Sequence, residues 1–281
     1  MIDFPENKYF HCYATANDDR FYYRDIQNLL RIKNTDPGVT KIQLYVAISE
    51  VEKINSIDRT FIWAVKKLFY QHPSIVLKKI FFKTNIGRDF SSYSIMNYFI
   101  KDEAAPDDYV FFQNRSGYGP FREGWLNEII LQYKKFDRTA ICGSTINFRD
   151  HPNRSQKKDL PHVQTYAFLT KILFLEKLGN FFPGAKESSR LEIILQGEIG
   201  LSQFFIRRGF GITCMEWPDE YINNESKPIN NKDIKDSVAQ SHQFYHKVFL
   251  NKPENVLRNT FKKLNLFLIL LINGFFTKMR V

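Results

Sequence analysis

Short hydrophobic runs alternate with amphipathic stretches along the first half of this chain. The runs at 8–16, 41–49, 75–83 and 109–113 are rich in β-branched and aromatic residues, which is typical of buried strands. Between two of them, residues 57–70 place apolar side chains at helical spacing. Strands that are separated by helices of crossover length pair in parallel. The alternation therefore predicts an α/β fold with a mostly parallel sheet flanked by helices.

Two of the hydrophobic runs stop abruptly at clusters of small and polar residues. One ends in N-I-G-R-D-F, residues 85–90, and the other belongs to D-Y-V-F-F-Q-N-R-S-G-Y-G-P-F, residues 108–121. Buried parallel strands present functional groups at the carboxyl edge of their sheet, so we expect a site there. Asn114 and Ser116 lie two residues apart and share one face of a strand. A polar strand end followed by a turn is the alternative interpretation of this pair.

The residue types of the first segment suit an anionic sugar ligand. Gly87 lets the backbone approach a ligand closely, and the planar guanidinium of Arg88 matches a phosphate or a carboxylate. Asp89 can bond a sugar hydroxyl. Alternatively, Asp89 or Ser91 is simply the N-cap of the helix that follows.

Charge and cysteine usage narrow the class of protein. The chain has 40 basic and 30 acidic residues, and its formal net charge of +10 favours nucleic acid, phosphate-bearing small molecules or an anionic membrane as partners. Its three cysteines are far apart and form no C-x-x-C, so we predict buried free thiols. The first residues, M-I-D-F-P-E-N-K, lack the pattern of a signal peptide, which predicts a cytoplasmic location.

The last residues differ from the rest of the chain. The apolar stretch 264–276 is flanked by lysine and arginine and is shorter than the roughly 20 residues that span a bilayer. We expect 256–281 to form a basic amphipathic helix that lies on an anionic membrane surface. Docking on the domain or on another subunit is the alternative. The predicted division is a main domain at 1–220, a polar linker or excursion at 221–255, and this tail.

The order of elements and the motifs N-x-G-x-D-F and N-x-S-x-x-G-P resemble a group of bacterial surface-polysaccharide glycosyltransferases, including the rhamnan-synthesis type. The resemblance covers about Lys8 to Pro218. It implies a GT-A-like, Rossmann-type catalytic domain of the hexosyltransferase type. Such an enzyme would move a sugar from a nucleotide sugar, with a UDP-sugar as the first choice. The acceptor would be a lipid-linked glycan, lipopolysaccharide, O-antigen or capsule chain at the inner face of the cell membrane.

The resemblance also has a departure that concerns metal binding. The family presents two carboxylates of a D-x-D motif to a divalent metal, and Asn114-Arg115-Ser116 falls on that motif here. Neutral amide and hydroxyl oxygens hold Mn²⁺ or Mg²⁺ weakly. Either the metal arrives with the donor diphosphate, or a cation such as Arg88 or Arg115 replaces it.

Roles for single residues follow from the resemblance. Glu198, expected at the start of a helix over 198–208, takes the place of the base that deprotonates the acceptor hydroxyl, with a favourable charge on the helix dipole as the alternative. Asp89 is the second expected catalytic residue. The expected donor-binding residues are Ala14, Thr15, Asn17, Asn85, Gly87, Arg88, Asn114, Arg115, Ser116 and His162.

Two other classes of protein stay open at this stage. A nucleic-acid-binding protein would explain the basic charge and the many aromatic residues, but most aromatics fall within hydrophobic runs and no nucleic-acid-binding motif is present. A non-catalytic glycan- or nucleotide-binding protein would explain the missing D-x-D carboxylates.

Overall fold

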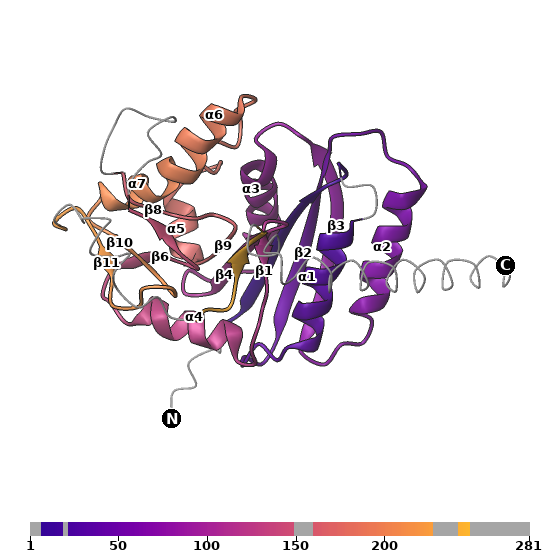
Figure 1. The fold of residues 1–281 in the computed structure, drawn as a ribbon, viewed down its shortest axis with the longest axis horizontal. Helices are drawn as coiled ribbons and strands as arrows, with labels where there is room; N and C mark the ends of the chain where they lie inside the picture. The colour runs from indigo at the N-terminus through magenta and orange to yellow at the C-terminus, as the bar shows by residue number, and fades with distance from the viewer. Residues whose placement is uncertain (1–6, 19–21, 149–159, 227–240, 248–281) are drawn as a thin grey trace, which may run out of the picture.

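The architecture is a mixed α/β fold around one large sheet. The computed structural model describes residues 7–18, 22–148, 160–226 and 241–247. Within them, eight strands form a sheet in the order β11-β10-β6-β9-β4-β1-β2-β3, flanked by helices (Figure 1). The predicted mostly parallel sheet with flanking helices is confirmed.

The strand bounds follow the predicted hydrophobic runs closely in the first half of the chain. The large sheet contains β1 (Tyr9–Ala16), β2 (Ile42–Glu50), β3 (Ile75–Thr84), β4 (Tyr109–Asn114), β6 (Thr139–Gly143), β9 (Ala167–Lys171), β10 (Gly211–Cys214) and β11 (Tyr221–Ile222). Two small sheets pair β5 (Gly117–Tyr118) with β12 (Tyr245–His246), and β7 (Ile146–Asn147) with β8 (His162–Val163).

Helices follow β1, β2 and β3 and return the chain to the start of the next parallel strand. The helices of the described residues are α1 (Tyr23–Asn34), α2 (Ser56–Leu68), α3 (Arg88–Ile100), α4 (Trp125–Lys134), α5 (Ile172–Lys177), α6 (Arg190–Glu192), the π-helical segment η1 (Ile193–Ile199) and α7 (Gly200–Ile206). None of the helices in the described residues is long and apolar enough to cross a membrane.

Strand direction changes at β9. Strands β3, β2, β1 and β4 are all parallel, and β6 is parallel to β10, but β9 runs antiparallel to both β4 and β6. The sequence pattern predicts one strand over 162–169, whereas the chain forms β8, turns, and then enters the sheet as β9. Hydrophobic periodicity does not encode strand direction, so this reversal could not be predicted from it.

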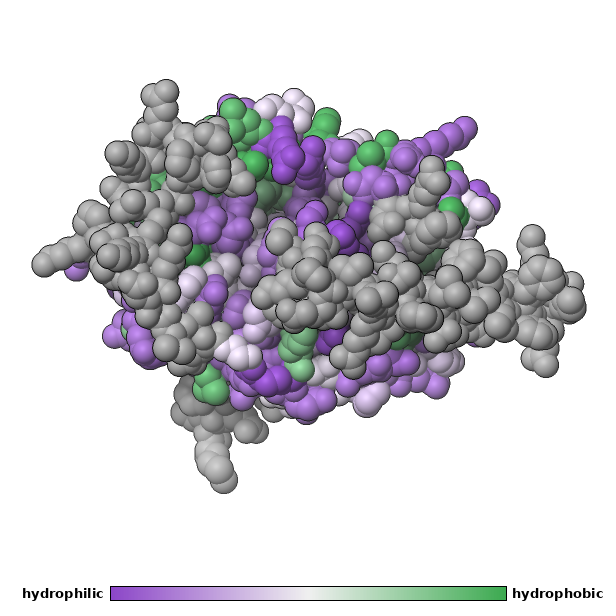
Figure 2. All heavy atoms as spheres, viewed as in Figure 1, coloured by the Kyte–Doolittle hydropathy of each residue, from purple (hydrophilic) through white to green (hydrophobic). Residues whose placement is uncertain are grey.

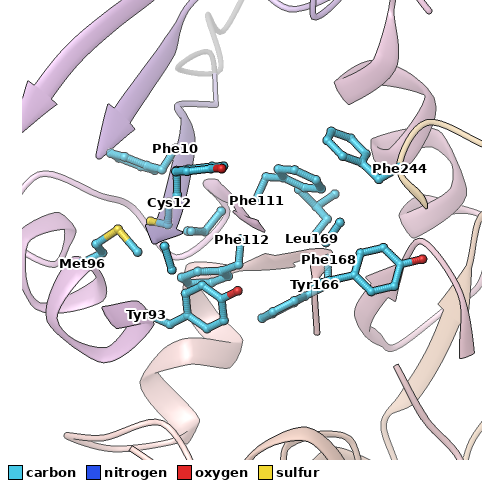
Figure 3. Close-up of a cluster of buried hydrophobic side chains, with 14 of the residues drawn as sticks. Phe10, Cys12, Tyr93, Met96, Phe111, Phe112, Tyr166, Phe168, Leu169 and Phe244 are labelled. Atoms are coloured by element: carbon cyan, nitrogen blue, oxygen red, sulfur yellow. The ribbon is translucent and has the colours of Figure 1, made fainter. Parts of the chain in front are cut away.

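An aromatic core joins α3 to the centre of the sheet (Figure 3). The ring of Tyr93 lies 4.8 Å from that of Phe112, and Phe112 stacks on Phe168 at 5.1 Å. These side chains are at most 1% exposed. The packing holds the start of α3 beside the end of β4. The three cysteines are buried and free, as predicted.

The predicted linker and tail are described only in part. Residues 241–247 pair through β12 with β5, so this piece of the predicted polar linker packs on the main domain. The predicted membrane helix at 256–281 lies outside the described residues.

Candidate active site

The two predicted segments meet at the carboxyl edge of the parallel strands. In the register of β1 and β4, Ala14 lies opposite Asn114, and the backbone N–H of Arg115 donates to the carbonyl of Ala14 at 3.2 Å. The Asn114 side-chain amide donates to Oδ2 of Asp89 at 2.7 Å. Four predicted site residues, from β1, β4 and its end, and α3, are therefore linked by direct contacts.

Asn114 uses both ends of its amide group. Besides its bond to Asp89, its Oδ1 accepts the backbone N–H of Ser116 at 2.8 Å, which closes a tight turn after β4. The side chain is only 8% exposed. Since the oxygen faces the turn and the nitrogen faces Asp89, Asn114 positions a carboxylate rather than offering an oxygen to a ligand.

The start of α3 is built on two left-handed residues. Gly87 and Arg88 have φ values of 66° and 46°, and Gly87 is the N-cap residue. The predicted capping by Asp89 or Ser91 is wrong, because the helix begins before either and no side chain caps it. This frees the Asp89 carboxylate for other contacts.

The close backbone approach that Gly87 permits is to the protein itself. The Gly87 N–H donates to the carbonyl of Glu187 at 2.8 Å, and an added Cβ would lie 2.0 Å from the carbonyl oxygen of Ala185. Gly87 therefore locks α3 against the segment before α6. Its neighbours Asn85 and Arg88 are exposed at the edge of the sheet.

Cations surround the partly buried Asp89. Burial raises the pKa of its carboxyl group, whereas Lys83, Arg115, the bond from Asn114 and Arg88 act against this rise. Lys83 is itself buried, which lowers its pKa to about 8, and Asp89 opposes that shift. Sequence reasoning missed Lys83, although a lysine within a hydrophobic strand run is a visible signal.

Arg115 is anchored by residues of β1, of α1 and of the turn between them. Its Nε lies 3.2 Å from Oδ2 of the fully buried Asp25, and its guanidinium also contacts Asp18 and the Thr15 hydroxyl. Burial alone would lower the pKa of Arg115, but the two carboxylates outweigh it and raise the pKa. Arg115 thus stays charged at the edge of the sheet.

The residues at the end of β1 that are predicted to contact a nucleotide also bind neighbouring parts of the protein. The side chain of Asn17 accepts the backbone N–H groups of Val51 and Glu52 at 2.7 and 2.9 Å and donates to the Glu52 carbonyl at 2.7 Å. These bonds fix the loop after β2 at the same edge. The fully buried Ala14 can reach a ligand through its backbone only.

A distant segment adds a lysine that sequence reasoning missed. After β12, the backbone N–H of Lys247 donates to the carbonyl of Ser116 at 2.7 Å. Burial lowers the pKa of Lys247, and the nearby charges of Arg24, Arg115 and Arg190 lower it further. A lone lysine in a polar stretch carries no local signal, so only the fold brings it to this edge.

Glu198 lies inside a helix instead of at its start. The helix begins after the Ser189 cap and runs through α6, η1 and α7, so the prediction of a helix that opens at Glu198 is wrong, and so is the helix-dipole alternative. The π-helical turn presses Gly197 against Phe90, where an added Cβ would lie 2.6 Å from the ring. Burial raises the pKa of Tyr93, and the charges of Asp89 and Glu198 raise it further, so both carboxylates act on the same phenol.

A second carboxylate on this edge was missed. Glu216 follows β10, and its backbone N–H donates to the carbonyl of Ser144 at 3.1 Å. Burial raises the pKa of Glu216, while a hydroxyl bond from Thr145 opposes the rise. Glu216 also raises the pKa of Tyr166, whose carbonyl accepts the backbone N–H of Asn114 at 3.0 Å.

His162 lies on β8, in the small two-stranded sheet. It is 1% exposed, its Nδ1 is 2.8 Å from the carbonyl of Leu160, and its Nε2 is 3.5 Å from the Asn147 amide. These contacts hold the ring in the protein interior, and its expected role toward a donor stays a prediction.

The donor set at the D-x-D-like position does not fit a divalent cation. Hard cations require several carboxylate or carbonyl oxygens. Here the Asn114 oxygen is taken by the Ser116 N–H, and Asp89 is held by an amide and surrounded by cations. In the described part of the chain, no three His, Cys, Asp or Glu residues come together as a possible metal site.

No protein-family model and no curated protein matches this sequence. Similar solved structures include S. aureus TarS, with 14% identity and a TM-score of 0.42, and a 4-diphosphocytidyl-2C-methyl-D-erythritol synthase, with 11% identity and a TM-score of 0.43. The match covers 67% of this chain and 32% of TarS, and 82% of this chain and 95% of the synthase. A third is galactosyltransferase LgtC with donor and acceptor sugar analogs, at 12% identity and a TM-score of 0.40, covering 74% of this chain and 73% of that chain.

This chain spans about a third of the length of TarS. LgtC is a galactosyltransferase and the second structure is a synthase, and all three identities are below 15%.

Proposed function

We propose that this protein is a glycosyltransferase that uses a nucleotide-sugar donor. The observation that carries the proposal is the Asn114–Asp89 pair, which holds a carboxylate at the carboxyl edge of four parallel strands within a group of cations. The carboxyl edge of a parallel sheet is where nucleotide ligands bind in α/β folds. Cations suit the diphosphate, and a fixed carboxylate suits a sugar hydroxyl.

The reaction would use these groups as follows. Asp89 accepts a hydrogen bond from a hydroxyl of the donor sugar and orients its anomeric carbon. The acceptor hydroxyl attacks that carbon while a carboxylate, for which Glu198 is the first choice, takes its proton. The bond between the anomeric carbon and the diphosphate oxygen breaks, and its electron pair leaves with the diphosphate.

Finer features of the proposal rest on composition and on the motifs. A UDP-sugar as donor and a surface polysaccharide or lipid-linked glycan as acceptor follow from the resemblance of N-I-G-R-D-F and N-R-S-G-Y-G-P. The net charge of +10 and the basic, apolar tail at 256–281 support attachment to the inner face of the cell membrane. Truncation before Val256 tests this, because the shortened protein should no longer sediment with membranes.

A donor panel tests the activity itself. The full chain is incubated with a set of nucleotide sugars, and both binding and donor hydrolysis are measured. At least one donor should bind and turn over slowly without an acceptor. Binding without any turnover would favour a non-catalytic binding protein, and tight RNA binding without nucleotide binding would favour the nucleic-acid-binding class.

A further inference from the structure

Lys247 lies next to Arg115 at the proposed donor site, because its backbone N–H is 2.7 Å from the carbonyl oxygen of Ser116, and the charges of Arg24 and Arg190 also act on it. Arg24 lies in the first turn of α1, Arg115 follows β4, Arg190 begins α6, and Lys247 follows β12. Each of the three arginines acts on Lys247 as a like charge, while Asp89 acts on it as the opposite charge. Figure 2 shows hydrophilic residues gathered between α6 and α3. The carboxylates of Asp18 and Asp25 pair with Arg115, and the remaining positive charge of the group favours an anion.

Lys247 stands at the D-x-D-like position itself. Its backbone N–H is bonded to the Ser116 carbonyl, and the β5–β12 pairing fixes the chain on both sides of that bond. Ser116 is the second residue of the pair that would face a divalent metal in the family that this chain resembles. A lysine therefore arrives, from a segment far along the sequence, where a metal ion would otherwise be expected.

We propose that this group of cations, and not a divalent metal, binds the donor diphosphate and stabilises it as the leaving group. The inference rests on the proposed function and deepens it. When the bond to the anomeric carbon breaks, the diphosphate oxygen keeps the electron pair, and the negative charge that forms is met by lysine and arginine. The poor fit of Asn114, Ser116 and Asp89 to a divalent cation agrees with this assignment.

Titration of the full chain with pyrophosphate and with UDP, each in EDTA and again in Mn²⁺, tests the proposal. The Kd measured in EDTA should match the Kd measured in Mn²⁺ within about twofold. Lys247→Ala and Arg190→Ala should each weaken pyrophosphate binding about tenfold, as expected for the loss of one charge-assisted contact. Arg190 is exposed, so its variant is expected to fold.

Lys66→Ala is the matched control. Lys66 is exposed in the last turn of α2, which lies at the opposite edge of the sheet because α2 leads from the end of β2 to the start of β3. The Lys66→Ala variant removes the same charge, and we expect it to leave pyrophosphate binding unchanged. Lys247→Arg keeps the charge and should restore most of the affinity that Lys247→Ala loses, which separates charge from folding.

The outcomes separate the inference from the proposed function. Binding that requires Mn²⁺, or equal binding by Lys247→Ala, Arg190→Ala and Lys66→Ala, would overturn the cation assignment while leaving a metal-dependent transferase possible. Metal-independent pyrophosphate binding without transfer from any donor would overturn the proposed function and leave the anion site standing.

Discussion

The bond between Asn114 and Asp89 explains why the D-x-D-like motif lacks its first carboxylate. The Asn114 amide donates to Asp89 at 2.7 Å, a contact that a carboxylate at position 114 could not make. Two carboxylates at that separation would repel each other, and one would take up a proton. At the scale of the residue, asparagine keeps Asp89 in place and acts against the rise of its pKa that burial causes, so the lack of the first carboxylate is consistent with the proposed function.

Replacing Asn114 by aspartate tests this account. Asn114→Asp should lower the free energy of unfolding at pH 7 by about 2 kcal/mol, because a bond to a carboxylate becomes a like-charge contact. The repulsion raises the folded-state pKa of the pair, so the loss is largest above that pKa and should shrink as the pH falls. Urea unfolding at pH 7 and pH 5.5 measures it. The exposed Asn127→Asp is the control, and an equal, pH-independent loss in both variants would contradict the account.

The choice of base can be decided between two carboxylates. Glu198→Gln should reduce kcat by roughly 10²–10⁴ and leave donor affinity nearly unchanged, since a general base acts only in the chemical step. Glu216→Gln removes a second partly buried carboxylate from the same edge and should retain most of kcat. The pH profile of kcat should lose its acidic limb only in the variant that lacks the base. The reverse pattern would assign the base to Glu216.

At the scale of elements, the strand–helix alternation was predictable and the reversals were not. Strands β1 to β4 and the helices between them follow directly from hydrophobic periodicity. The π-helical turn η1 has no such pattern, and it places Glu198 in the middle of a helix. The group of Asn114, Asp89 and Arg115 could be predicted, because the ends of strands carry local sequence signals. Lys247 could not, because long-range pairing alone brings it there.

Gly87 couples the start of α3 to the segment before α6, and this can be measured. Gly87→Ala should lower the free energy of unfolding by about 3 kcal/mol, the sum of about 1 for a left-handed residue and about 2 for overlap with the Ala185 carbonyl. Gly179→Ala is the control, since φ is +74° there but nothing lies within 4 Å of the added Cβ. It should cost about 1 kcal/mol by urea unfolding. Equal losses of unfolding free energy in the two variants would show that the close approach of Gly87 to Ala185 contributes nothing to stability.

At the scale of the whole molecule, two histidines from distant parts of the chain are buried in the protein interior. His11 in β1 is fully buried and bonded to Gln113, and burial lowers its pKa to about 3. His242, in the segment that returns to β5, has a pKa lowered to about 4 by burial and by Arg122. Both rings are neutral in the folded protein. His11 lies within the run 8–16, which is predicted to be a buried strand, whereas His242 lies in a polar stretch and could not be recognised as buried from the sequence.

The buried histidines predict that stability falls in mild acid. Unfolded histidines take up protons below about pH 6.5, whereas the folded rings do so only near pH 3 to 4. Each histidine therefore lowers the free energy of unfolding by about 2 kcal/mol as the pH falls from 6.5 to 5. The raised pKa values of Asp89 and Glu216 act in the opposite direction, so the comparison must be with variants. Urea unfolding at pH 7 and pH 5 should show a smaller acid loss in His11→Asn than in the wild type, and a smaller one still in the double variant with His242→Asn. The same acid loss in all three proteins would place the histidines in contact with solvent.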